Sequence, residues 1–348
     1  MTGPAEGGTP AGAGPTDTDW ASAVAAVREL PVDARVLLIC HVNPDGDALG
    51  SMLGFGLGLR RLGVRQLQAT FPGPPGVPEP FRWLPGLELL VPEDEAYPDP
   101  DLVICFDVAS ESRLGDLVDR LDKAGAALVL DHHASNTRFG GIHLVDPHAA
   151  ATSVVAEGLL DRLGVALDAG IAACFYVALS TDTGSFRFEA TTPAVHETAA
   201  RLLATGIRPG DISRRIFDTR PFGAVRLFGE VLVRARLEPA AAAGRGLVWT
   251  YATQEDLARH DQPAYVLEAL IDSVRCTAEA DVSCVLKQVS AAEWAVSLRS
   301  KGAVDVSAVA VALGGGGHRF AAGFTGRGSV DEVVDRIRAE LGGALLAG

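Results

Sequence analysis

The chain has 348 residues, of which 48% are hydrophobic and 21% are charged, and its formal net charge is −14. This composition is typical of a folded globular protein and excludes a disordered chain. The acidic balance also excludes a protein that coats long nucleic acid, because such binding depends on lysine and arginine. A small anionic substrate stays compatible with one locally positive pocket.

The length of the chain exceeds what a single hydrophobic core usually organises, so we expect two domains. The five cysteines occur singly, mostly within apolar runs, which predicts reduced thiols rather than a disulfide framework. The sequence has neither a signal-peptide pattern nor an apolar run approaching the roughly 20 residues that cross a bilayer. We therefore expect a cytoplasmic protein without a membrane partner.

Residues 1–16 contain only Gly, Ala, Pro, Thr, one Glu and one Met, and we expect them to form a disordered tail. A first domain is expected over 17–195, where short apolar runs alternate with longer amphipathic ones. This alternation predicts an α/β fold with a mostly parallel sheet flanked by helices. The predicted elements are strands at 34–40, 101–107 and 126–133, and helices at 50–63, 115–125, 151–164 and 169–182.

Helical patterns at 193–206 and 211–220 predict a helical linker over 196–221. The Ala/Gly stretch at 238–246 predicts a hairpin loop early in a second, smaller α/β domain, residues 222–348. The elements predicted for this domain are strands at 246–252, 279–289 and 293–300, and helices within 253–274 and at 330–342.

The run HVNPDGDALGS begins directly after an apolar strand and leads into a helical pattern. It therefore lies at the carboxyl end of a strand, where α/β sheets bind ligands. It offers one imidazole, from His41, and two carboxylates, from Asp45 and Asp47. Taken alone, the run is explained equally well as a surface turn that caps a helix.

The same kind of pattern recurs at three other places. Asp107 follows the strand LVICF, the triplet Asp131, His132 and His133 ends the strand AALVL, and Asp182 ends the apolar run ACFYVALST. A single Asp at such a position is often only a helix cap. Four separate elements that each end in acidic or imidazole groups indicate one shared site.

The charges of these groups favour a metal centre. Four carboxylates that converge within a few ångströms repel one another, and some would have to take up protons. Two divalent cations neutralise four aspartates and still accept a phosphate. Oxygen and imidazole donors without thiolate suit Mn²⁺, Mg²⁺ or Co²⁺ better than a structural zinc site, and Mn²⁺ is the ion that we expect.

The motifs HVNPDGDALGS, DHH, STDTGSFRF and GGGGHRFAAG, together with the single Asp107, resemble the DHH/DHHA1 phosphoesterase superfamily. The resemblance extends over nearly the whole chain after the tail. Order and spacing are most similar to the NrnA-type branch of bacterial oligoribonucleases and pAp phosphatases, with the actinobacterial enzymes that act on cyclic di-AMP and pApA. It implies a DHH domain over 17–195 and a DHHA1 domain over 222–348.

The resemblance also implies two metal ions and a role for each residue of the DHH triplet. His133 is expected near the substrate phosphate as a catalytic residue, with Asp131 orienting a neighbouring histidine. The implied metal ligands are His41 and Asp45 for one ion, Asp47, His132 and Asp182 for the other, and Asp107 as the bridge between them.

The run of four glycines at 314–317 is able to bring several backbone N–H groups against an anion without obstruction by side chains. By resemblance to the DHHA1 module, this loop binds substrate together with Arg299. A glycine-rich turn before a tightly packed segment is the simpler explanation. Arg275 and Lys287 compete with Arg299 for the role. The predicted substrate-binding residues are Arg299, Gly315, Gly316, Gly317 and His318.

The function predicted from this resemblance is hydrolysis of phosphoric esters in short oligoribonucleotides and dinucleotides, in pApA and cyclic di-AMP, and at the 3′-phosphate of pAp. The resemblance also implies a homodimer. Within the same fold a single-strand exonuclease and a pyrophosphatase remain alternatives. Outside enzymes, the alternative is a nucleotide sensor that binds without catalysis.

Overall fold

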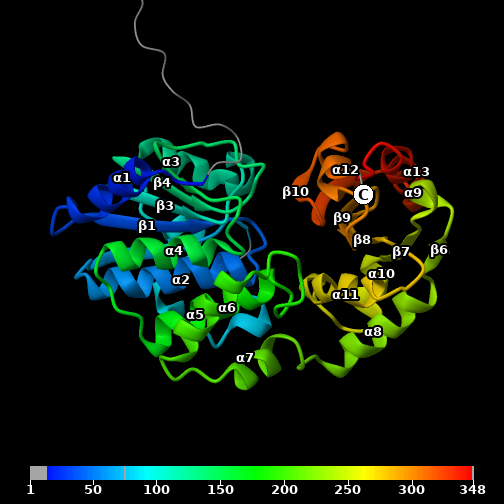
Figure 1. Ribbon diagram of the computed structural model, residues 1–348, viewed down its shortest axis with the longest axis horizontal. Helices are drawn as coiled ribbons and strands as arrows, with labels where there is room; N and C mark the ends of the chain where they lie inside the picture. The colour runs from blue at the N-terminus through cyan, green and yellow to red at the C-terminus, as the bar shows by residue number, and fades with distance from the viewer. Residues whose placement is uncertain (1–13, 74–75, 347–348) are drawn as a thin grey trace, which may run out of the picture. The chain divides into compact units, whose positions relative to one another are not determined.

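The computed structural model describes residues 14–73 and 76–346. The chain divides after Thr219 into two compact units, each with its own sheet (Figure 1). Most of the predicted tail lies outside the described residues. Its end does not fit the prediction, because the Thr16 hydroxyl caps the first helix by accepting from the backbone N–H of Asp19.

The first unit confirms the expected alternation of strands and helices. Its strands are β1 (Arg35–Cys40), β2 (Gln66–Thr70), β3 (Leu102–Phe106), β4 (Ala126–Asp131) and β5 (Ile142–Val145). Its α-helices are α1 (Asp17–Arg28), α2 (Gly46–Arg61), α3 (Val118–Lys123), α4 (Thr152–Arg162), α5 (Ala169–Asp182), α6 (Pro193–Leu203) and α7 (Pro209–Ile216). Short 3₁₀ segments are η1 (Glu79–Phe81), η2 (Leu87–Leu89), η3 (Glu93–Glu95) and η4 (Glu111–Leu117).

The five strands form one fully parallel sheet in the order β2-β1-β3-β4-β5. The chain leaves β1 towards β2 on one side and returns to β3 on the other. The order therefore reverses between β1 and β3, and a crevice at the carboxyl ends of such strands is the usual ligand site of an open α/β sheet. The strands β2 and β5 were not predicted from the sequence.

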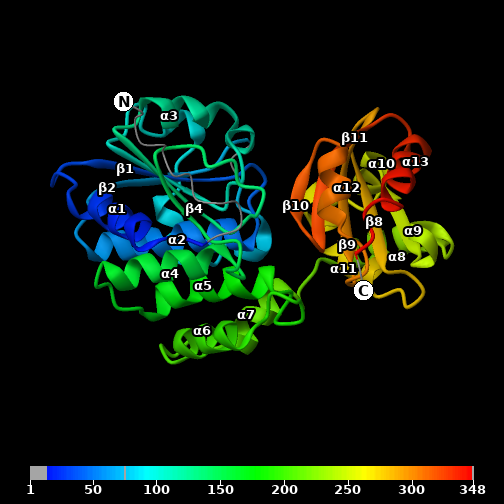
Figure 2. The ribbon, with the colours of Figure 1, turned by 45° about the horizontal axis from the view of Figure 1, so that its top comes forward.

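Both faces of this sheet are covered, which explains why its strands are apolar at nearly every position. Alternate residues of β1, such as Val36 and Leu38, pack with α2, α4 and α5 in one core. Leu37 and Ile39 face the other core, which includes Leu121 of α3. Figure 2 shows α2 and α4 between the sheet and α5. Helix α6 also packs into the first core, which places it with the first unit.

Glycines recur at every fourth position of α2 and allow a close approach of α5 and α4. A Cβ atom at Gly46, Gly50 or Gly54 would overlap atoms of α5, and one at Gly58 would overlap Leu160 of α4. Residues four apart share one face of a helix. Packing of α2 on α5 therefore depends on the absence of side chains along this face.

The second unit has a six-stranded mixed sheet in the order β10-β11-β9-β8-β7-β6. Its strands are β6 (Arg236–Glu238), β7 (Leu247–Ala252), β8 (Val282–Ser290), β9 (Glu293–Ser300), β10 (Gly316–His318) and β11 (Ala321–Arg327). Its helices are α8 (Phe222–Val233), α9 (Ala241–Gly244), α10 (Gln254–Arg259), η5 (Ala264–Ala269), α11 (Leu270–Arg275), α12 (Val306–Ala312) and α13 (Val330–Leu341).

Two predictions for the second unit have different outcomes. The hairpin loop at 238–246 is confirmed, since it joins the antiparallel strands β6 and β7. The predicted glycine loop is in part a strand, because Gly316 and Gly317 belong to β10 and pair with β11. The described helices include none that is long and apolar enough to cross a bilayer.

Candidate metal centre

His41 and Asp107 lie at the point where the strand order reverses. His41 directly follows β1 and Asp107 directly follows β3, and both side chains are buried. Asp107 has a φ of 60°, in the left-handed region that Asp adopts more readily than most residues. The His41 Nε2 atom lies 3.4 Å from Asp107 Oδ2. Two neighbouring strand ends therefore bring an imidazole and a carboxylate together.

Asp45 and Asp47 enter the site from the first turn of α2. Asp45 caps this helix, since its Oδ1 accepts from the backbone N–H groups of Asp47 and Ala48, each at 3.0 Å. Its other oxygen, Oδ2, lies 3.9 Å from His41 Nε2. One oxygen of Asp45 thus caps the helix while the other faces His41. The two interpretations of this residue, as a helix cap and as a metal ligand, are therefore compatible.

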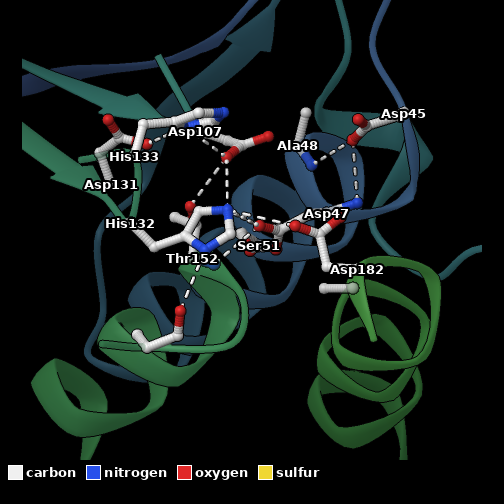
Figure 3. A network of polar contacts seen from close by, with 12 residues as sticks. Asp45, Asp47, Ala48, Ser51, Asp107, Asp131, His132, His133, Thr152 and Asp182 are labelled. Atoms are coloured by element: carbon white, nitrogen blue, oxygen red, sulfur yellow. Dashed lines mark hydrogen bonds and ion pairs between the residues drawn. The ribbon is translucent and has the colours of Figure 1, made fainter. Parts of the chain in front are cut away.

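The carboxylate of Asp107 lies between His41 and His132, and Figure 3 shows the side that faces His132. Its Oδ2 faces His41, and its Oδ1 lies 3.5 Å from His132 Nε2. The same His132 nitrogen lies 3.1 Å from Asp182 Oδ2 and 3.6 Å from Asp47 Oδ2. The six predicted ligands therefore meet around Asp107.

The two histidines predicted as metal ligands each contact a backbone carbonyl through Nδ1. His132 Nδ1 lies 3.1 Å from the carbonyl oxygen of Ala149, and His41 Nδ1 lies 2.8 Å from that of Val42. His41 Nδ1 also lies 3.0 Å from the guanidinium of Arg113. In both residues Nε2 is therefore the ring nitrogen that faces the carboxylates and would be available to a metal ion.

Asp131 and His133 form a separate pair beside this cluster. Asp131 is fully buried, and its Oδ1 lies 2.8 Å from His133 Nδ1. Its Oδ2 accepts from Asn136 Nδ2 at 2.6 Å. The His133 side chain is 21% exposed, against 4% for His132, so of the two it is the one that reaches solvent. The contact is compatible with Asp131 as the group that orients His133, and that role stays a prediction.

Asp47 is held by groups that the sequence analysis did not identify. The side chain is fully buried and accepts at Oδ1 from the Ser51 hydroxyl at 2.7 Å. It also accepts from the backbone N–H groups of Thr152 at 2.7 Å and Ser153 at 3.3 Å, which open α4. The N-cap of α4 is Ala151, which has no side-chain oxygen. The Asp47 carboxylate thus supplies the cap that this helix lacks.

The cluster contains several buried carboxylates, and the positive charge around them is too small to balance their negative charge. Burial and the charges of Asp107 and Asp182 raise the pKa of Asp47 well above its usual range. Burial alone would also raise the pKa of Asp107, but the hydrogen bond from His41 and three neighbouring histidines lower it. Burial alone would lower the pKa of His132, but the hydrogen bond and charge of Asp182 raise it well above its ordinary value. Protons therefore supply part of the positive charge that the site needs.

The donor set fits hard divalent cations. Asp107 belongs to two groups of donors, one with His41 and Asp45 and one with Asp47 and His132. Within each group the donor atoms lie within 4.8 Å of one another. In the described part of the chain, all ion pairs of these carboxylates are with histidine and none is with lysine or arginine. Oxygen and imidazole donors of this kind suit Mn²⁺ or Mg²⁺.

The cysteines nearest in sequence do not add thiolates. Burial raises the pKa of the Cys40 thiol well above its usual range, and it raises the pKa of Cys105 to about 12. Both side chains are fully buried within strands. They stay protonated at neutral pH, and a thiol in that state is a poor metal ligand.

The second unit brings two of the predicted substrate-binding residues into one row of its sheet. His318 of β10 pairs with Ala321 of β11, which pairs in turn with Arg299 of β9. Directly paired residues of antiparallel strands project from the same face. His318 and Arg299 therefore lie on one face, two strands apart, which is about 10 Å.

The glycine run is used largely within the fold. The N–H groups of Gly314 and Gly315 donate to carbonyls at the end of α12 at 3.0 and 2.7 Å, so they do not face an anion as expected. A Cβ atom at Gly315 or Gly317 would overlap the backbone of β11. Close strand packing thus explains these glycines, and anion binding by Gly316 and Gly317 remains a prediction.

Known proteins similar to this chain support the same conclusion about its family. The model of the DHH family N-terminal domain matches residues 35–207, and that of the DHHA1 domain matches 251–343. The "Bifunctional oligoribonuclease and PAP phosphatase NrnA" of Thermus thermophilus is 35% identical over 89% of this chain and 91% of its own length. The protein of the same name from Bacillus subtilis is 26% identical over 90% and 96%, respectively.

A solved structure shows the same fold. The crystal structure of an exopolyphosphatase-related protein from Bacteroides fragilis matches with a TM-score of 0.81 at 23% identity, covering 94% of this chain and 96% of that chain. Family, fold and the cluster around Asp107 agree. The chain belongs to the DHH family of phosphoesterases, carries a DHHA1 domain, and is a hydrolase that acts on phosphoric esters.

Proposed function

We propose that the chain hydrolyses short phosphorylated nucleotides in a reaction that depends on two divalent metal ions. The substrates proposed are short oligoribonucleotides, pApA and cyclic di-AMP, and the 3′-phosphate of pAp. The main support is the Asp107 carboxylate, whose two oxygens face different histidines at 3.4 and 3.5 Å. The two similar proteins named as oligoribonuclease and PAP phosphatase support the substrate class.

In this proposal His41 and Asp45 hold one ion, Asp47, His132 and Asp182 hold the other, and Asp107 bridges them. Manganese is the proposed ion. Two such ions would polarise a phosphate and lower the pKa of water, which is the chemistry required for hydrolysis. The carboxylates would exchange protons for metal, because burial and mutual repulsion favour added positive charge at Asp47.

His133 is the proposed acid beside the reacting phosphate. Its Nδ1 is held by Asp131, so its Nε2 is oriented by a buried and hydrogen-bonded carboxylate. The pKa of His133 is raised: burial would lower it, but the charge and hydrogen bond of Asp131 outweigh burial. A raised pKa favours the protonated imidazole, which would donate its proton to the leaving oxygen.

Arg299 and His318 are the proposed contacts for the nucleotide or its terminal phosphate, with the backbone of Gly316 and Gly317. Their support is the shared row of the second sheet. A homodimer is proposed from the family resemblance, and a cytoplasmic location from the five free thiols.

The test is to incubate purified protein with manganese, and separately with EDTA, against pAp, pApA, cyclic di-AMP, a five-residue RNA and pyrophosphate. Chromatography follows the products. Manganese-dependent release of mononucleotides is the expected result, and its rates rank the substrates. Hydrolysis of pyrophosphate alone, or tight binding of a dinucleotide without turnover, would overturn the proposal.

A further inference from the structure

Thr152 is the first residue of α4 and is fully buried. It does not belong to the predicted ligand set, yet it donates two hydrogen bonds into it. Its backbone N–H donates to Asp47 Oδ2 at 2.7 Å, and its hydroxyl donates to Asp107 Oδ1 at 3.0 Å (Figure 3). One residue thus joins two carboxylates that come from α2 and from the end of β3.

The two bonds restrain the carboxylates in different ways. The χ2 angle of Asp is broadly distributed, so the orientation of the Asp107 carboxylate depends on the groups that contact its two oxygens. The hydroxyl of Thr152 fixes the plane of that carboxylate by holding Oδ1 on the side of Asp47 and His132, which leaves Oδ2 towards His41. Because Thr is β-branched and starts a helix, its own rotamer is restricted.

We infer that Thr152 is a positioning residue that sets the bridging geometry of Asp107 and thereby the affinity of the metal pair. The inference rests on the proposed metal centre and names one residue that affects its affinity for metal ions. Hydrogen-bond partners that orient metal ligands typically change metal affinity by about 10- to 100-fold when they are removed. The bond to Asp47 comes from the backbone N–H, which Val, Ser and Ala keep, so these substitutions test the hydroxyl alone.

The decisive variant is Thr152→Val, which keeps the shape of the side chain and removes its hydroxyl. Thr152→Ser restores the hydroxyl without the methyl group. Thr250→Val is a matched control, because Thr250 is also fully buried and donates its hydroxyl to a backbone carbonyl, that of Val231, at 2.6 Å. Each protein is stripped with EDTA and titrated with manganese by calorimetry, and its thermal unfolding is followed in EDTA.

We expect Thr152→Val to bind manganese about 10- to 100-fold more weakly, with fewer spin-coupled manganese pairs in its EPR spectrum. Thr152→Ser should bind close to the wild type. Thr250→Val should lose thermal stability and keep its manganese affinity. A purely structural Thr152 would behave like Thr250, with lower stability and unchanged affinity, and that result would overturn the inference.

If Thr152→Val does not fold, Thr152→Ala takes its place, since a smaller side chain cannot clash and also lacks the hydroxyl. Wild-type affinity in that variant would contradict the inference as well. The failure of the inference and that of the proposed function are distinguishable. A wild type that binds no manganese overturns both, whereas a wild type and a Thr152→Val protein with equal affinity overturn only the role of Thr152.

Discussion

The two halves of the candidate metal centre differ in how firmly the fold holds them. In the inner half, Asp47 is fully buried and receives three hydrogen bonds, from Ser51, Thr152 and Ser153. In the outer half, the Asp45 side chain is 58% exposed and is held by the first N–H groups of its own helix. Asp47 is therefore preorganised by the core, and Asp45 by a single helix turn.

The largest effect is expected where the halves meet. Asp107→Asn keeps the size of the side chain and its tolerance for a left-handed backbone, but replaces one carboxylate oxygen with an amide NH₂. We expect hydrolysis to fall by at least about a thousandfold, the scale of losing a main electrostatic stabiliser. Manganese titration should show both ions weakened. A variant that loses one ion and binds the other normally would show that Asp107 is no bridge.

His133→Ala is expected to separate chemistry from metal binding. His133 contacts Asp131 and reaches solvent, while the other histidine of the triplet lies among the carboxylates. Turnover should fall by about a hundredfold or more, as for the loss of a general acid, with manganese content unchanged. Metal analysis of the purified variant provides the check. Loss of manganese from this variant would assign His133 to the ligand set instead.

Substitution of one aspartate in each half compares them directly. Asp47→Asn should lower manganese affinity more than Asp45→Asn, because Asn is as good a helix cap as Asp and preserves the start of α2. We expect a difference of about tenfold in calorimetric titrations, within the range for disturbed metal sites. Equal losses would mean that burial of Asp47 does not strengthen its half of the centre.

The packing that supports the inner half can be tested through α2. A methyl group at Gly50 would overlap the backbone carbonyl of Cys174 in α5. Gly50→Ala should therefore destabilise the protein by about 1 to 3 kcal/mol, as overpacking does. Gly229→Ala is the control, since nothing lies within 4 Å of a Cβ atom at Gly229 of α8, and it should stabilise by about 0.5 to 1 kcal/mol. Chemical denaturation measures both values.

The smallest effect concerns pH. The pKa values of His132 and Asp47 are raised in the folded, metal-free protein. Groups with raised pKa values stabilise the fold below their unfolded pKa, and this stabilisation is lost as pH rises through the folded pKa. Metal binding requires the deprotonated ligands, so it strengthens with pH. The increase in melting temperature caused by manganese should be larger at about pH 8 than at about pH 6. Each kcal/mol of additional stabilisation by the metal corresponds to about 2 to 4 °C. A gain that shrinks with pH would contradict this assignment.

The sequence predicted most of the first unit because its signals are local. Apolar runs followed by acidic or imidazole residues marked the ends of β1, β3 and β4, and the helix predicted over 169–182 is α5 with the same limits. The six residues predicted as metal ligands were chosen from their positions at element ends, and the structure places them close together. Strands β2 and β5 were missed because QLQAT and IHLV are short and partly polar.

The parts that could not be predicted depend on contacts between distant segments. The bonds of Thr152 to Asp47 and Asp107 span 105 and 45 residues of chain, and no local pattern marks them. Ser51 had a local signal, since it lies four residues after Asp47 on one helix face. The glycine run at 314–317 was predicted as an open loop because glycine permits many conformations, whereas its packing against β11 appears only in the folded sheet.

The spacing of glycines along α2 restricts which substitutions this helix tolerates. Gly46, Gly50, Gly54 and Gly58 are not among the predicted metal ligands. A Cβ atom at any of these positions would nevertheless overlap atoms of another helix, so the positions favour glycine. Gly56 is restricted as well, because a Cβ atom there would overlap Leu89 and Leu38. A search for distant relatives should therefore weigh a four-residue glycine period after the aspartates as heavily as the aspartates themselves.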